Sequence, residues 1–338
     1  MPQLWHDQHN HPSGKAGLAP QVKQKQQLKE VTTDMNKQAL ELDGIVTVLN
    51  TPFDDDDRVD LVSLKRHVRY ALECGVVGFV VPAMASEVGR LSAPERRSIV
   101  ETVLEEVSGR AVVVGGASDG SAHKRIAHTK DLVRAGCDGV MVSIPYEDDA
   151  QFAAHVREVA DVGPNFLMLQ DWDRFGYGIP VPMIVQLFDE VEAFRSLKIE
   201  VVPAGVKYSE VSKATGGGLH LAGGWAVGQL IEGLDRGVNA FMPTGMHEIY
   251  VRIYSLYHRG DREAAKQLFY RLLPVVAFTN QDLDISIHFF KRLLFEQGIY
   301  ATSRVRQPIM RFDSYHERIT RELIEYVRRL CAEVEEAS

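Results

Sequence analysis

Eight short apolar runs, each followed by a stretch of helical period, constrain the fold of this chain more than any other feature. The apolar runs cover residues 45–49, 76–82, 111–115, 139–144, 165–169, 194–199, 219–223 and 240–243. The helical stretches cover residues 60–74, 92–108, 121–135, 149–161, 181–193, 206–215, 226–237 and 246–258. Several runs are apolar at consecutive positions, which is typical of parallel strands buried on both faces.

Eight strand–helix units predict an α/β fold, a TIM (β/α)8 barrel. The competing architecture is a doubly wound open sheet, which usually carries a glycine-rich phosphate turn after its first strand. The first run is followed instead by residues 50–53, Asn-Thr-Pro-Phe, and no dinucleotide fingerprint or Walker loop occurs elsewhere. Further helical stretches at 261–277, 282–297 and 316–336 predict a C-terminal helical extension.

These patterns divide the chain into three parts. We expect a polar, flexible N-terminal arm over residues 1–41, a catalytic barrel over 42–258 and a C-terminal helical domain over 259–338. The net charge of −8 argues against binding to nucleic acid or to an anionic membrane surface. The apolar runs fall short of the about 20 residues that a membrane helix needs.

The cysteine pattern bears on compartment and metal binding. Cys74, Cys137 and Cys331 are far apart and show no metal-ligand spacing. An odd, sparse set of thiols fits a reducing compartment. We therefore expect a cytoplasmic protein without a metal site.

Lys198 is the first candidate for chemistry, because it lies at the far end of the sixth apolar run. Active sites of TIM barrels lie at the C-terminal ends of the strands. Burial disfavours the charged form of an amine, and a neutral amine can attack a ketone to form a Schiff base. The alternative is a lysine that caps the strand and points to solvent. Lys207 is a competitor for the same role, but we expect it on the surface of the following helix.

Five landmarks in order along the chain resemble the dihydrodipicolinate synthase / N-acetylneuraminate lyase family. They are Thr51-Pro52-Phe53, the segment 83–96 with Ala85-Ser86-Glu87, Ile144-Pro145-Tyr146, Leu169-Gln170-Asp171 and Leu197-Lys198-Ile199-Glu200. The resemblance extends from about Gly44 to about Arg329. It implies a barrel with a C-terminal helical cap, usually assembled as a tetramer, in which a lysine on strand six forms a Schiff base with pyruvate or another 2-keto acid. Lys198 occupies that position.

The chemistry also needs a seat for the carboxylate of the keto acid. The turn Ala85-Ser86-Glu87 is the candidate, because backbone N–H groups and the Ser86 hydroxyl together would bind an anion. The resemblance places Met84 and Ala85 where the family carries hydroxyl residues, so the seat is altered. Glu87 matches the family's acid, which we interpret as an orienting or structural residue.

A proton carrier is the next requirement. The resemblance places Gln170 where the family commonly has a tyrosine, and an amide does not shuttle protons at neutral pH. We expect Asp171 or a bound water to take this role, the alternative for Asp171 being a hydrogen bond to Lys198. Tyr146 is a further candidate, with packing at the barrel mouth as the equal alternative.

Recognition of the rest of the substrate is assigned to the loops after strands five to eight. Arg174 lies near the position of a family arginine that contacts a carboxylate, and Gly224 leaves room for a ligand beside the backbone. Trp172 and Trp225 could stack on a substrate or pack a loop. Glu200 lies two residues beyond Lys198, on the same strand face, where it could tune the amine or contact substrate. His247 is a polar contact or a structural residue.

The sequence therefore predicts a cytoplasmic Schiff-base lyase, an aldolase or a dehydratase, that acts on pyruvate or a 2-keto-3-deoxy acid. No metal, nucleotide or flavin is implied, because the covalent Schiff base through Lys198 carries the reaction. The alternatives are 4-hydroxy-tetrahydrodipicolinate synthase and a non-catalytic barrel that binds a keto acid. We expect a small-molecule substrate, no nucleic acid or membrane partner, and a homo-oligomer, either a tetramer or a dimer.

Overall fold

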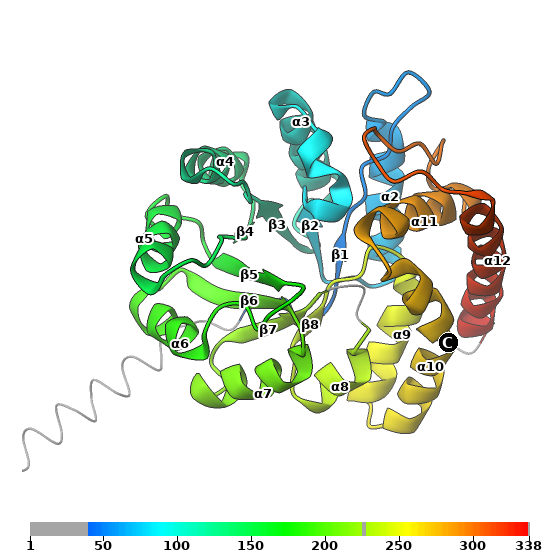
Figure 1. Cartoon of the computed structure of the whole chain (residues 1–338). Helices are drawn as coiled ribbons and strands as arrows, with labels where there is room; N and C mark the ends of the chain where they lie inside the picture. Colours follow the sequence, from blue (N-terminus) through cyan, green and yellow to red (C-terminus); the bar gives the residue numbers. More distant parts are fainter. Residues whose placement is uncertain (1–39, 225–227, 337–338) are drawn as a thin grey trace, which may run out of the picture. The chain divides into compact units, whose positions relative to one another are not determined.

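The computed structural model of the protein describes residues 40–224 and 228–336, and in this part of the chain eight parallel strands close into a barrel (Figure 1). The strands are β1 (Gly44–Val48), β2 (Gly78–Val81), β3 (Val112–Gly116), β4 (Gly139–Val142), β5 (Leu167–Asp173), β6 (Phe194–Val201), β7 (His220–Gly223) and β8 (Ala240–Phe241). Each strand pairs with the next in sequence, and β8 pairs with β1. The predicted TIM barrel is confirmed. Residues 1–39 of the predicted N-terminal arm and Trp225 lie outside the described residues.

Helices follow the strands and surround the barrel (Figure 1). They are α2 (Leu61–Glu73), α3 (Ala93–Val107), α4 (Ala122–Ala135), α5 (Asp149–Ala160), α6 (Val181–Glu190), α7 (Ala204–Ala214), α8 (Leu230–Asp235) and α9 (His247–His258). The C-terminal extension consists of α10 (Arg262–Thr279), α11 (Leu283–Glu296) and α12 (Ser314–Glu336). Two short 3-10 turns, Met84–Ser86 and Val88–Arg90, lie between β2 and α3.

Local sequence explains where these helices begin and end. The Asp60 carboxylate accepts hydrogen bonds from the backbone N–H groups of Val62 and Ser63 and so caps α2. The N–H of Ser92 donates to the Glu95 carboxylate at the start of α3. Gly136 ends α4 with a φ of +91°, a conformation that glycine adopts without strain.

The alternation of side chains along the strands separates two buried clusters. Apolar side chains on one face fill the barrel, among them Val48, Val114 and Met168. Side chains on the other face pack against the surrounding helices, among them Leu169 and Ile199. Lys198 pairs in register with Gln170 on β5 and with Ala222 on β7. Because Ala222 belongs to the interior cluster, this face of β6 points into the barrel.

The strands β5 and β6 extend further than the sequence predicts. Their pairing continues to Asp173 opposite Val201, whereas the apolar runs end at residues 169 and 199. Polar side chains at the C-terminal end interrupt the apolar pattern although the backbone continues as strand. The extension of β6 carries Glu200 to the mouth of the barrel, on the same strand face as Lys198.

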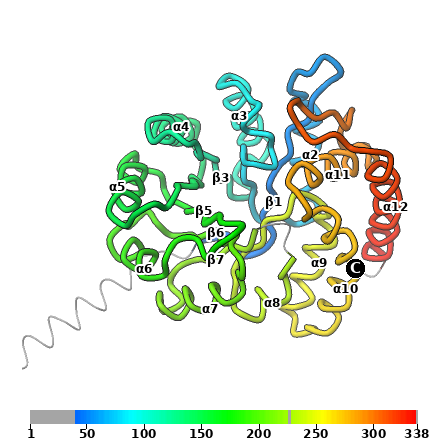
Figure 2. Tube along the Cα trace, viewed as in Figure 1, coloured from blue at the N-terminus to red at the C-terminus, as the bar shows by residue number. Residues whose placement is uncertain are grey.

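The C-terminal helices pack along one side of the barrel, beside α9 and α2 (Figure 2). The described residues from Leu40 onward form a single compact unit by their contacts, so α10 to α12 are continuous with the barrel. The segment between α11 and α12 crosses back to the loop before α2, where the Thr302 hydroxyl donates to the Phe53 carbonyl at 2.6 Å. No helix within the described ranges is long and apolar enough to span a membrane.

Candidate active site at the C-terminal mouth of the barrel

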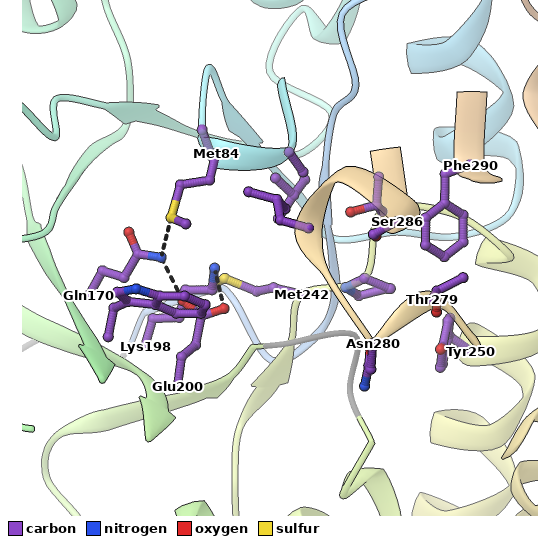
Figure 3. Close-up of a pocket in the computed structure, with 17 residues that line it drawn as sticks. Met84, Gln170, Lys198, Glu200, Met242, Tyr250, Thr279, Asn280, Ser286 and Phe290 are labelled. Atoms are coloured by element: carbon purple, nitrogen blue, oxygen red, sulfur yellow. Dashed lines mark hydrogen bonds and ion pairs between the residues drawn. The ribbon is translucent and has the colours of Figure 1, made fainter. Parts of the chain in front are cut away.

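Lys198 lies in a cleft of about 660 Å³ at the C-terminal mouth of the barrel (Figure 3). Its side chain is 6% exposed, so the alternative of a lysine that points to solvent is wrong. The cleft is lined by Val48, Ala83, Met84, Ala85, Gln170, Trp172, Lys198, Glu200, Met242, Pro243, Thr244, Tyr250, Thr279, Asn280, Leu283, Ser286 and Phe290. The amine therefore faces the hollow at the barrel mouth.

A carboxylate and an amide surround the amine. The Glu200 Oε1 atom lies 3.1 Å from Lys198 Nζ, and the Glu200 side chain is 5% exposed. The other oxygen, Oε2, accepts a hydrogen bond from Gln170 Nε2 at 2.5 Å (Figure 3). The three side chains meet because Lys198 and Glu200 are two residues apart on one strand, while Gln170 pairs in register with Lys198.

Gly224 makes room for this arrangement. A Cβ atom at Gly224 would lie 2.1 Å from Glu200 Oε1. The space that we expected a ligand to use beside Gly224 is therefore occupied by the Glu200 side chain. Gly224 lines an adjoining hollow of about 710 Å³ that shares Trp172, Glu200 and Asn280 with the main cleft.

The wall opposite Lys198 comes from the C-terminal helices (Figure 3). Ser286 on α11 and Asn280 in the turn before it bring hydroxyl and amide groups to that side, while the Thr279 hydroxyl of α10 donates to the Val275 carbonyl at 3.0 Å. Met84 and Met242 supply apolar surface nearer the amine. The sequence pattern missed this wall, because nothing in the periodicity of α10 and α11 marks which residues reach the barrel mouth.

Asp171 does not contact Lys198, and this part of the prediction is wrong. Adjacent residues of a strand point to opposite faces, so Asp171 points outward when Gln170 points inward. Its carboxylate forms an ion pair with Lys207 and accepts a hydrogen bond from the Ile179 N–H at 2.9 Å. Burial raises the pKa of Asp171, while the Lys207 ammonium opposes that shift.

Lys207 is buried, not on the helix surface as predicted. Besides Asp171, its ammonium donates to the Ile179 carbonyl at 2.7 Å. Burial lowers the pKa of Lys207, and Asp171 opposes the change. Because both groups lie outside the cleft, the Asp171–Lys207 pair fastens the loop after β5 to α7 rather than serving the site.

Tyr146 also lies outside the cleft. Its hydroxyl donates to Asp149 at the start of α5, and its ring packs edge-on against Phe152 with a centroid separation of 5.4 Å. The hydrogen bond to Asp149 raises the pKa of Tyr146. The packing alternative describes this residue, and we withdraw Tyr146 as a catalytic candidate.

The turn after β2 divides its residues between the cleft and the core. Ala85 lines the cleft, and its carbonyl accepts from Asn50 Nδ2 at 2.7 Å. Ser86 is fully buried, and its hydroxyl donates to the Leu49 carbonyl at 2.5 Å and accepts from the Ala83 N–H. The Ser86 hydroxyl therefore binds the backbone and not a substrate anion, contrary to the prediction.

Glu87 holds the C-terminal helices to the barrel. Its carboxylate lies 2.6 Å from Lys291 Nζ and accepts from the backbone N–H of Arg306 at 2.8 Å. Both side chains of the Glu87–Lys291 pair are fully buried. This geometry agrees with the structural interpretation of Glu87 and does not bring it into the cleft as a substrate-binding residue.

Arg174 and His247 lie away from the amine. Arg174 lines the adjoining hollow, with its guanidinium 3.7 Å from the Asp282 carboxylate across the rim. His247 is fully buried beside His67, with 3.2 Å between their Nε2 atoms, and burial lowers its pKa to about 3. Within the described residues no cluster of three or more His, Cys, Asp or Glu is placed to hold a metal ion.

The dihydrodipicolinate synthetase family model matches residues 41–326, and the chain belongs to this family. It is 28% identical over 297 residues to L-2-keto-3-deoxyarabonate dehydratase from Azospirillum brasilense, covering 85% of this chain and 94% of the relative. It is 25% identical over 241 residues to 4-hydroxy-tetrahydrodipicolinate synthase from Methanosarcina mazei, covering 69% and 81%.

The structure of dihydrodipicolinate synthase from Rhodopseudomonas palustris shares the fold, with a TM-score of 0.78 and 22% identity over 87% of this chain and 99% of that chain. The expected family and fold are thus confirmed. As a member of this family of synthases and dehydratases, the protein is a lyase.

Proposed function

We propose that the protein forms a Schiff base between Lys198 and a 2-keto acid, and that it dehydrates a 2-keto-3-deoxy sugar acid. The observation that carries the proposal is the buried Lys198 amine in the cleft at the barrel mouth. It is the one lysine among the described residues that line this cleft. An amine in such a cleft can attack the C2 carbonyl of a keto acid, and loss of water from the carbinolamine leaves an iminium.

Two observations favour dehydration over condensation with a second substrate. The dehydratase relative is matched over nearly its whole length. The wall opposite Lys198 carries the neutral polar groups of Asn280 and Ser286, which suit the hydroxyl groups of a sugar acid. The synthase relatives keep condensation of pyruvate with an aldehyde as the second candidate.

Borohydride trapping tests the proposal. Pyruvate and borohydride are added to the folded protein, and the modified peptide is mapped by mass spectrometry. We expect a reduced adduct on Lys198 that is absent from the Lys198→Ala variant and retained in Lys130→Ala, which removes an exposed lysine of α4. An unmodified protein after treatment with pyruvate and longer 2-keto acids would favour a binding barrel without catalysis.

We also propose that the protein is a homo-oligomer in the cytoplasm. The cysteines among the described residues are free, which fits a reducing compartment. Tyr270, Leu273 and Phe295 expose apolar surface on α10 and α11. Light scattering of the purified protein would measure the mass in solution, and a monomer at micromolar concentration would contradict association.

A further inference from the structure

We propose that Glu200 is the catalytic residue that moves the proton in this reaction, and that Gln170 is the positioning residue that holds its carboxylate. The inference rests on the proposed Schiff base at Lys198. It assigns to a carboxylate of β6 the role that the sequence left open when Gln170 replaced a tyrosine.

The position of Glu200 is the first argument. One carboxylate oxygen of Glu200 lies 3.1 Å from Lys198 Nζ. Since this amine attacks C2 of the keto acid, the oxygen lies within reach of the neighbouring C3 and its protons. The ionisable side chains among the described residues that line the cleft are Lys198, Glu200 and Tyr250. Tyr250 lies on the opposite wall beside Thr279, away from the amine (Figure 3).

The surroundings of Glu200 are the second argument. Gln170 donates to Oε2, and Gly224 leaves the space in which the carboxylate lies, so the side chain is held on the cleft side of β6. Asp171 and Tyr146, the proton carriers predicted from the sequence, bond to Lys207 and Asp149 outside the cleft. A fixed carboxylate beside the reacting amine needs little reorganisation during proton transfer.

A single carboxylate can move the protons of the dehydration, with solvent water as the other reactant. The Glu200 carboxylate takes a proton from C3 of the iminium, and the C–H electrons form a C2–C3 double bond, which leaves an enamine. The enamine nitrogen then pushes electrons toward C4, the C4–O bond breaks, and the departing oxygen takes the proton held by Glu200. One water leaves, Glu200 returns to the carboxylate, and hydrolysis of the conjugated iminium releases Lys198.

The exchange of pyruvate methyl protons with deuterium tests the inference independently of the natural substrate. In D₂O, the wild-type protein is expected to exchange these protons through the enamine, as followed by NMR. Glu200→Gln keeps the shape of the side chain and its contact with Gln170 but cannot take a proton. We expect this variant to form the borohydride adduct on Lys198. Its rate of proton exchange should be at least about 100-fold lower than that of the wild type.

Two further variants sharpen the result. Glu200→Asp keeps a carboxylate and should restore part of the exchange, which also covers the case in which Glu200→Gln does not fold. Glu158→Gln, an exposed position on α5, should exchange at the wild-type rate.

The two proposals fail in different ways. Absence of the adduct from the wild-type protein overturns the Schiff-base function itself. Exchange by Glu200→Gln at the wild-type rate, or loss of the adduct together with exchange from this folded variant, overturns the role of Glu200 alone.

Discussion

At the residue scale, the site depends on which face of a strand each side chain takes. Lys198 and Glu200 share the inner face of β6, and Gln170 meets them from β5. The sequence predicted Lys198 because it ends an apolar run, and period-two spacing brought Glu200 to the same face. The same rule excludes Asp171 once Gln170 points inward. The buried hydroxyl of Ser86 could not be predicted, because it depends on how the turn after β2 folds back on Leu49.

Gly224 gives a direct test of the Glu200 geometry. In Gly224→Ala the new methyl group would overlap the Glu200 carboxylate, at 2.1 Å from Oε1. Because a side chain rotates more readily than a strand moves, we expect Glu200 to turn away and proton exchange on pyruvate to fall at least about tenfold, with the fold retained. Gly89→Ala is the control, since nothing lies within 4 Å of its added Cβ. Equal exchange by both variants and the wild type would show that the carboxylate position is unimportant.

At the element scale, a buried histidine pair joins β1, α2 and α9 to the segment after α11. His67 contacts His247 and the Tyr300 hydroxyl, with 2.9 Å between His67 Nδ1 and that oxygen. His247 in turn lies 3.2 Å from the Thr47 hydroxyl of β1. Burial lowers the pKa of His247 to about 3 and that of His67 well below its usual value. Both rings are therefore neutral in the folded protein at neutral pH.

The histidine pair should make the fold sensitive to acid. Both folded-state pKa values are below the unfolded value near 6.5, so the unfolded chain binds more protons once the pH falls below it. The contribution of the two histidines to the free energy of unfolding is thus fully present above about pH 6.5, and it decreases as the pH falls toward 3. Each histidine should contribute a loss of about 2 kcal/mol between pH 7 and pH 5.

Urea unfolding at several pH values measures this effect. His67→Gln removes one of the two groups and should reduce the decrease between pH 7 and pH 5 by about 2 kcal/mol, although it lowers stability at pH 7 through lost hydrogen bonds. His123→Gln, at an exposed position of α4, should leave the decrease unchanged. A decrease of the same size in His67→Gln would mean that the buried pair is not its source.

The boundaries of the elements show what periodicity can and cannot predict. The order of all eight strands and of the helices from α2 to α12 follows from runs of apolar residues and their spacing. The ends of β5 and β6 do not, because polar residues such as Gln170 and Glu200, which line the cleft, interrupt the apolar pattern while the strands continue. The polar side chains that a site needs are the ones that interrupt the apolar pattern at these strand ends.

At the scale of the whole molecule, the C-terminal helices are part of the site. Thr279, Asn280 and Ser286 form the cleft wall opposite Lys198. The buried Glu87–Lys291 pair ties α11 to the turn after β2 that carries Ala85 into the cleft. The centroid of the Phe53 ring lies 4.2 Å from Lys291 Nζ and 4.3 Å from the Arg306 guanidinium. Cations from α11 and from the segment between α11 and α12 therefore contact this ring. Sequence patterning predicted the C-terminal helices but not the Glu87–Lys291 pair, because a pairing between residues 204 positions apart leaves no local signal.

Removal of the Lys291 charge should therefore lower both the stability of the fold and the activity at the cleft. Lys291→Met leaves the Glu87 carboxylate buried without its ammonium partner, which should lower the free energy of unfolding by about 3–5 kcal/mol. The double variant Glu87→Gln, Lys291→Met removes the unpaired charge and should recover part of that loss in urea unfolding. Proton exchange on pyruvate should decrease in Lys291→Met and recover with stability in the double variant. The loss of unfolding free energy in the double variant could instead equal the sum of the losses in Glu87→Gln and Lys291→Met. Glu87 and Lys291 would then not act as a pair, and α11 would be held to the barrel by apolar packing alone.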